Sequence, residues 1–129
     1  MIVADTDVLI DALHGRAPSA ERIKLELGTG TLATTAITVF ELRSGANSTT
    51  ASEQIETLLA GVTILPFDER AAERAASARR DLEAAGSSIG MADYLIAGVC
   101  LAHSAILLTR NRKHFERVPG LVLGWEAGE

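Results

Sequence analysis

The sequence has a single cysteine and very few aromatic residues. Because Cys100 has no second thiol to pair with, an internal disulfide is excluded, and its apolar surroundings favour a buried small side chain. We expect a reducing, cytoplasmic location. Aromatic residues make up only 4% of the chain, so the core must consist of Ala, Leu, Ile and Val. Such a core suits helices packed closely on a parallel sheet.

Neither a membrane helix nor a targeting segment is apparent. The stretch from Leu95 to Leu108 is rich in apolar residues, but it is too short to span a bilayer and is interrupted by His103 and Ser104. The apolar residues 1–4 have no basic region before them and lead directly into Asp5. We therefore expect no membrane association.

The chain also lacks an excess of positive charge. It carries 12 Lys and Arg against 17 Asp and Glu, which gives a net charge of −5. This balance excludes a protein that binds nucleic acid through its overall charge, so a polyanion would have to be held locally.

Strand-like and helical patterns alternate along the 129 residues. Short apolar or β-branched segments predict strands at residues 2–4, 31–35, 62–65, 105–109 and 121–123. Helical patterns cover residues 7–14, 19–27, 37 to about 45, 50–59, an Ala-rich segment from Asp68 to Gly86, and 91–102. This order predicts an α/β fold with a mainly parallel central sheet and helices on both faces. Without a repeat or linker, residues 1–129 are expected to form one domain.

Carboxylates in three places of the sequence are candidate site residues. Asp5 follows an apolar strand, and Asp7 comes two residues later, at the kind of strand end where α/β sheets bind ligands. Capping of the next helix by Thr6 or Asp7 explains only one of these two acids.

Glu41 in TAITVFELRSG faces small side chains, although an exposed Glu is the simpler interpretation of it alone. Asp93 lies on the apolar side of a central helix, where a carboxylate is costly unless paired, protonated or metal-bound; a helix-start role is the alternative.

The loop after the strand at 105–109 is basic. Thr109 and Asn111 lie where another parallel strand is expected to end. Four of the 12 basic residues fall within eight positions here: Arg110, Arg112, Lys113 and Arg117. A charge run is usually a solvated surface, but this one adjoins the acidic residues, where a polyanion would have to be held.

The candidate ligands include neither histidine nor cysteine. Hard oxygen ligands select Mg²⁺ or Mn²⁺, whereas Zn²⁺ prefers His or Cys. A metal on carboxylates beside a basic rim is typical of a phosphodiester hydrolase. We therefore predict a metal-dependent nuclease.

Four segments of the chain resemble one known family. IVADTDVLIDAL, TAITVFELRSG, IGMADYLIAG and LLTRNRKHFERVPGL occur in the order and spacing of PIN-domain toxins of VapBC modules, and the resemblance covers essentially the whole chain. It implies a three-layer α/β/α fold, a homodimer, Mg²⁺ or Mn²⁺, and RNA with single-strand character as the substrate. It further implies that the chain is the endoribonuclease toxin of a type II toxin–antitoxin pair, held by a cognate VapB-like antitoxin. We expect the Ala-rich helix to offer this partner an apolar anchor.

Carried over by position, the resemblance implies that Asp5, Glu41 and Asp93 bind the metal. Asn111 completes the catalytic set, where many relatives have a fourth acid. The residues expected to bind substrate are Thr6, Thr109, Arg110, Arg112, Lys113 and His114. The sequence leaves one or two metal ions open, because Asp7 stands where relatives often have Asn or Ser, and either Asp7 or Asp11 would have to replace the missing fourth charge.

Two other functions compete with this interpretation. The stretch DTDV at residues 5–8 fits the first motif of haloacid-dehalogenase-like phosphatases, with Asp5 as nucleophile. That family also needs a downstream lysine and a late paired acid; this chain has only Lys24 and Lys113, and LLTRNRKHF contains no acid. The second alternative is a catalytically silent PIN-like module that binds RNA or protein. The intact set of Asp5, Glu41 and Asp93 argues against it.

Overall fold

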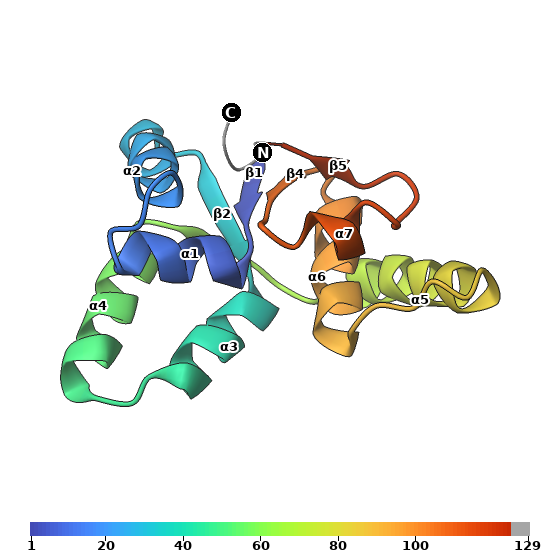
Figure 1. Cartoon of the computed structure of the whole chain (residues 1–129), viewed down its shortest axis with the longest axis horizontal. Helices are drawn as coiled ribbons and strands as arrows, with labels where there is room; N and C mark the ends of the chain where they lie inside the picture. Colours follow the sequence, from blue (N-terminus) through green and yellow to red (C-terminus); the bar gives the residue numbers. More distant parts are fainter. Residues whose placement is uncertain (125–129) are drawn as a thin grey trace.

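Five short strands form a parallel sheet in the order β3-β2-β1-β4-β5 (Figure 1). They are β1 (Ile2–Ala4), β2 (Leu32–Thr35), β3 (Thr63–Leu65), β4 (Ile106–Leu108) and β5 (Val122–Leu123). The computed structural model describes residues 1–124, so residues 125–129 of the predicted domain lie outside the described residues. All four pairings of these strands are parallel, as predicted. The central β1 lies between β2 and β4, so the carboxyl ends of these three strands share one edge.

Helices cover both faces of the sheet, which confirms the three-layer arrangement. One face carries α1 (Thr6–Leu13), α2 (Ser19–Thr29), α3 (Ala36–Gly45) and α4 (Thr49–Ala60); the other carries α5 (Glu69–Ala84) and α6 (Met91–Ala102) (Figure 1). Successive strand residues point to opposite faces. Val3 and Leu107 therefore enter the core beneath α5 and α6, whereas Ala4 and Leu108 enter the core beneath α1 to α4.

The pair α5 and α6 packs unusually closely. A Cβ atom at Gly98 would lie 2.5 Å from the carbonyl oxygen of Ala71, so only glycine permits this approach. The buried alanines of α5, Ala71, Ala75 and Ala78, belong to this packing surface. The expectation that the Ala-rich helix offers them to a partner is therefore wrong. This close contact instead fixes α6, which carries Asp93.

One helix was not expected from the sequence. Residues Arg112–Phe115 form the four-residue helix α7 in the segment that we predicted to be a loop. Four residues are too few to give a helical period. The fully buried Phe115 anchors α7 in the core beside α6. Among the described residues, no helix has the length and apolar character needed to cross a membrane.

Candidate active site

Asp5 lies at the carboxyl end of β1 and begins α1. Its Oδ1 accepts a hydrogen bond from the backbone N–H of Thr6 at 2.8 Å, and its Oδ2 accepts one from the Thr109 hydroxyl at 2.6 Å. Asp5 is therefore the N-cap residue of α1, and the expectation that Thr6 or Asp7 plays this role is wrong. With only 6% of the residue exposed, this carboxylate is held rigidly inside the sheet edge.

Burial makes the charge on Asp5 costly. The pKa of Asp5 is raised to about 7, first by desolvation and then by repulsion from Asp7, with a smaller contribution from Asp93. Hydrogen bonds from Thr109 and Thr6 oppose this rise. The pKa of Asp7 is also raised, chiefly by burial. The site thus concentrates negative charge that a cation would neutralise.

Glu41 reaches this site from α3, the helix that directly follows β2. Its Oε1 accepts a 2.6 Å hydrogen bond from the Thr6 hydroxyl, which also lies 3.0 Å from the Thr38 hydroxyl. Thr35 caps α3 by accepting the N–H of Thr38 and so fixes where the helix starts. Glu41 is half-buried, so the simpler interpretation of it as a fully exposed Glu does not describe it. Thr6, expected to contact substrate, links two carboxylates: its backbone N–H donates to Asp5 and its hydroxyl donates to Glu41.

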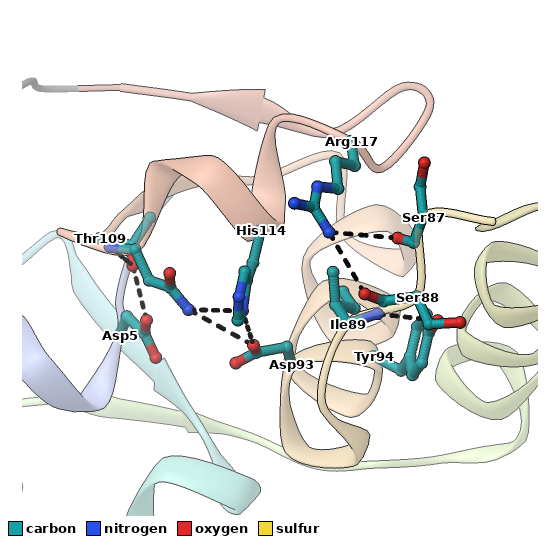
Figure 2. A network of polar contacts seen from close by, with 10 residues as sticks. Asp5, Ser87, Ser88, Ile89, Asp93, Tyr94, Thr109, His114 and Arg117 are labelled. Atoms are coloured by element: carbon teal, nitrogen blue, oxygen red, sulfur yellow. Dashed lines mark hydrogen bonds and ion pairs between the residues drawn. The ribbon is translucent and has the colours of Figure 1, made fainter. Parts of the chain in front are cut away.

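Asp93 faces Asp5 from the first turn of α6, and Figure 2 shows the two carboxylates pointing toward one another. Oδ2 of Asp93 lies 2.9 Å from Nδ1 of His114 and 3.4 Å from Nδ2 of Asn111. The two partner atoms are themselves 2.9 Å apart. Asp93 therefore lies in a helix start, as the alternative interpretation predicts, and it also joins a polar cluster; its binding of a metal stays a prediction.

Thr109 connects the two halves of the site. While its hydroxyl donates to Asp5, the same oxygen accepts the backbone N–H of Asn111 at 3.0 Å. We expected Thr109 to bind substrate, but it is only 1% exposed. Its hydroxyl is instead used internally, to hold Asp5 and the turn that leads into α7.

Asp7 and Asp11 hold the turn after β4 from the side of α1. The backbone N–H of Arg110 donates to Asp7 Oδ2 at 3.1 Å, and Arg110 Nε lies 2.9 Å from Asp11 Oδ2. Asp11 also lies 3.7 Å from the Arg16 guanidinium and accepts from the Ser19 hydroxyl. The buried Asp11 is thus already neutralised by cations, which argues against its use for a second metal. By contrast, Asp7 Oδ1 is buried and has no hydrogen-bond partner within residues 1–124.

The basic residues of this segment separate into two groups. Arg110 contacts Asp7 and Asp11 and keeps about half of its side chain exposed (51%), and Lys113 is exposed on α7. Arg117 turns away from them: it donates to the carbonyl oxygens of Ser87 and Ser88 at 3.5 and 3.2 Å (Figure 2). The expectation of one continuous basic rim is therefore wrong for Arg117, which fastens the α5–α6 loop.

Sequence reasoning missed the anchoring of that loop. Besides Arg117, the Tyr94 hydroxyl accepts the N–H of Ile89 at 3.1 Å (Figure 2). These bonds fix the chain just before Asp93. The one available signal was that the single tyrosine of the chain directly follows the candidate acid.

The structure brings Asp5, Glu41, Asp93 and Asn111, which lie in four different segments of the chain, into one polar network. Within residues 1–124 no three His, Cys, Asp or Glu side chains already converge as a preformed metal cage. Mg²⁺ does not need one, because it keeps several waters and binds through one or two carboxylates together with substrate phosphate. The buried, mutually repelling acids, and the Asp7 oxygen that has no partner among the described residues, fit a divalent cation that prefers oxygen ligands.

Comparisons with known proteins agree with this architecture. The family model of the PIN domain matches residues 2–121. The tRNA(fMet)-specific endonuclease VapC of Shigella flexneri is 30% identical over 121 residues, 91% of each chain, and Ribonuclease VapC2 of Rickettsia felis is 31% identical over 129 residues, 95% of this chain and 96% of the relative. Among solved structures, VapBC2 from Rickettsia felis bound to a promoter DNA fragment has a TM-score of 0.87 at 27% identity, covering 97% of this chain and 99% of the other. VapBC-1 from nontypeable Haemophilus influenzae has a TM-score of 0.80 at 28% identity, covering 96% and 97%. The chain belongs to the PIN-domain family, in which its relatives are VapC proteins.

Proposed function

We propose that this chain is an endoribonuclease that uses Mg²⁺ or Mn²⁺ and serves as the toxin of a type II toxin–antitoxin pair. The observation that carries the proposal is the pair of facing carboxylates, Asp5 at the end of β1 and Asp93 at the start of α6. The names of the relatives, which are endonucleases and ribonucleases, support RNA as the substrate. A haloacid-dehalogenase-like phosphatase is no longer a competing interpretation, because the PIN model matches nearly the whole chain.

Each acid has a defined part in this proposal. Asp5 and Asp93 would hold the cation, and Thr6 and Thr109 keep both oxygens of Asp5 in place. The bond from Thr6 occupies Oε1 of Glu41, so Oε2 is the atom with which Glu41 would bind the cation or orient water. The cation, when bound, would polarise the scissile phosphate and make water a better nucleophile. Attack by water leaves a 5′-phosphate and a 3′-hydroxyl.

Local cations would hold the RNA despite the net charge of −5. Arg110 is oriented by Asp11 and remains half-exposed, and Lys113 extends into solvent from α7. A guanidinium whose Nε is already fixed loses less side-chain entropy when it contacts a phosphate. Arg112 and His114 remain predicted substrate contacts on the same short helix.

An antitoxin is the expected partner. The structural neighbours from Rickettsia felis, Salmonella typhimurium and Haemophilus influenzae are VapBC complexes, which supports a VapB-like protein here. An Arg or Lys of that protein could enter the carboxylate cluster and displace the metal. A groove lined by Ile10, Leu42, Ala46 and Ile55 also has Glu41 in its lining and offers the apolar anchor that α5 does not.

We also propose a homodimer. Phe40 on α3 and Met91 at the start of α6 are large apolar residues with 69% and 54% of their surface exposed, and the two helices touch. Exposed apolar residues on adjoining elements favour a protein interface. Phe40→Ser should shift the sedimentation coefficient toward that of a monomer, whereas Leu25→Ser, at an exposed position on α2, should not.

Induction in cells tests the proposed function. Expression of the wild type alone should arrest growth and produce new RNA 5′ ends, and Asp93→Asn should do neither. Coexpression with the protein encoded by the neighbouring gene should relieve the arrest. RNA binding without cleavage by the purified wild type would instead favour the catalytically silent module. Harmless expression in a host from which that neighbouring gene is deleted would remove the toxin role but not the nuclease.

A further inference from the structure

His114 contacts Asp93 from α7, the helix that the sequence did not predict. Its Nδ1 lies 2.9 Å from Asp93 Oδ2, closer than the amide nitrogen of Asn111 at 3.4 Å (Figure 2). Residue 114 is held in this place by its neighbour Phe115, which is fully buried in the core. The contact between α6 and α7 is thus built on a fixed backbone.

The chemistry of imidazole decides which group bonds to Asp93. Nδ1 carries either a proton or a lone pair, so it cannot donate to Asp93 and accept from Asn111 at the same time. An ionised carboxylate only accepts hydrogen bonds. Nδ1 lies equally close, at 2.9 Å, to Asp93 Oδ2 and to the Asn111 amide nitrogen. The bond to the carboxylate is charge-assisted and therefore the stronger of the two, which favours Nδ1–H and makes His114 the principal donor to Asp93.

This donor also links the two carboxylates of the site. Asp5 is held by the Thr109 hydroxyl, the same oxygen accepts the N–H of Asn111, and α7 then brings His114 to Asp93. Six residues, 109–114, thus fix Asp93 relative to Asp5. In Figure 2 the second oxygen of Asp93 is turned toward Asp5.

We infer that His114 is a positioning residue whose Nδ1–H fixes one oxygen of Asp93 and leaves the other for a divalent cation. This inference rests on the proposed function, in which Asp5 and Asp93 bind that cation. Donors of this kind that hold a metal-binding carboxylate typically contribute 10- to 100-fold, as an order of magnitude, to metal affinity. By fixing the orientation of Asp93, His114 compensates in part for the negative charge that a fourth acid at position 111 would add to the metal site.

Three substitutions at one position test the inference. The amide nitrogen of Asn in His114→Asn can take the place of Nδ1, whereas that of Gln in His114→Gln reaches the place of Nε2 and cannot donate to Asp93. We expect His114→Ala and His114→Gln to weaken Mn²⁺ binding by roughly 10- to 100-fold, measured by titration calorimetry on metal-free protein. His114→Asn should bind Mn²⁺ about as well as the wild type. Asp93→Asn should lose binding entirely.

The outcomes separate the inference from the function on which it rests. If His114→Ala and His114→Gln bind Mn²⁺ like the wild type while Asp93→Asn does not, the role of His114 is refuted and the metal site stands. Equal weakening in all three variants at position 114 also refutes it, because a purely structural role would not distinguish Asn from Gln. A wild type that binds no Mn²⁺ overturns both. Thermal unfolding without metal checks that each variant is folded.

Discussion

The Thr109 hydroxyl donates a 2.6 Å hydrogen bond to Asp5 and thereby joins the carboxyl ends of the adjacent strands β4 and β1. Both residues are almost fully buried. The bond opposes the desolvation that raises the pKa of Asp5 to about 7. A buried carboxylate that loses such a donor has no water to replace it.

Thr109→Val should therefore destabilise the protein at neutral pH. Valine matches threonine in shape but leaves Asp5 without its donor, at a cost of about 1–3 kcal/mol for a buried polar group. Urea unfolding at pH 7 measures the change. Thr109→Ser keeps the hydroxyl, so its free energy of unfolding should fall clearly less than that of Thr109→Val. Equal losses of stability in the two variants would point to a packing effect at this position rather than the hydrogen bond.

The raised pKa of Asp5 predicts how stability changes with pH in the metal-free protein. Between the unfolded value near 3.8 and about 7, the folded state binds more protons than the unfolded state. The contribution of Asp5 is therefore greatest at low pH and is lost as the pH rises through about 7. Asp5→Asn removes this contribution. The unfolding free energy of the variant minus that of the wild type should therefore increase from pH 4 to pH 7.5. A difference that stays constant over this range would contradict the assignment.

Asp7→Asn should stabilise the metal-free protein at neutral pH. Asp7 raises the pKa of Asp5 by repulsion, and its own buried Oδ1 has no partner within the described residues. The variant keeps an oxygen for the Arg110 N–H but removes the charge. Thermal unfolding should show a higher midpoint at pH 7 and no gain at pH 3, where both acids are protonated. An equal gain at both pH values would indicate a packing effect instead.

Lys113 and Arg117 should differ in how they affect RNA binding. Each phosphate contact with single-stranded RNA contributes roughly 0.7 to the slope of log K against log salt. Lys113→Ala should therefore lower the slope by about that amount. Arg117→Ala should leave the slope unchanged and reduce stability, because Arg117 is bonded to Ser87 and Ser88. Fluorescence anisotropy from 50 to 200 mM salt distinguishes the two. The same slope change for both residues would contradict the separation of the basic segment into two groups.

The sequence predicted the sheet and its three layers, and it singled out Asp5 and Asp93, for clear physical reasons. Alternating strand and helix patterns require a parallel sheet, and a carboxylate such as Asp93 on an apolar helix stands out because its burial is costly. The hydrogen bonds that hold these acids, from Thr109 to Asp5 and from His114 to Asp93, were not predictable in the same way. The bond between Asp5 and Thr109 depends on β1 lying beside β4, a neighbour relation that periodicity does not specify.

Short elements and side-chain directions account for the rest. The four residues of α7 give no period, so the approach of His114 to Asp93 was hidden. Charge counting grouped Arg117 with its basic neighbours, although backbone carbonyls hold it elsewhere. Glu41 could be placed near the site only through the resemblance, because its link to Asp5 runs through the side chain of Thr6.

Cleavage of RNA by the purified protein, with analysis of the ends produced, tests the central claim most directly. The wild type should cut RNA in Mn²⁺ or Mg²⁺, stop when the metal is chelated, and leave 5′-phosphate and 3′-hydroxyl ends. Asp5→Asn and Asp93→Asn should be folded and inactive. Cleavage that survives exhaustive chelation or both substitutions, or that leaves 2′,3′-cyclic phosphates, would contradict a metal-dependent site at these two carboxylates.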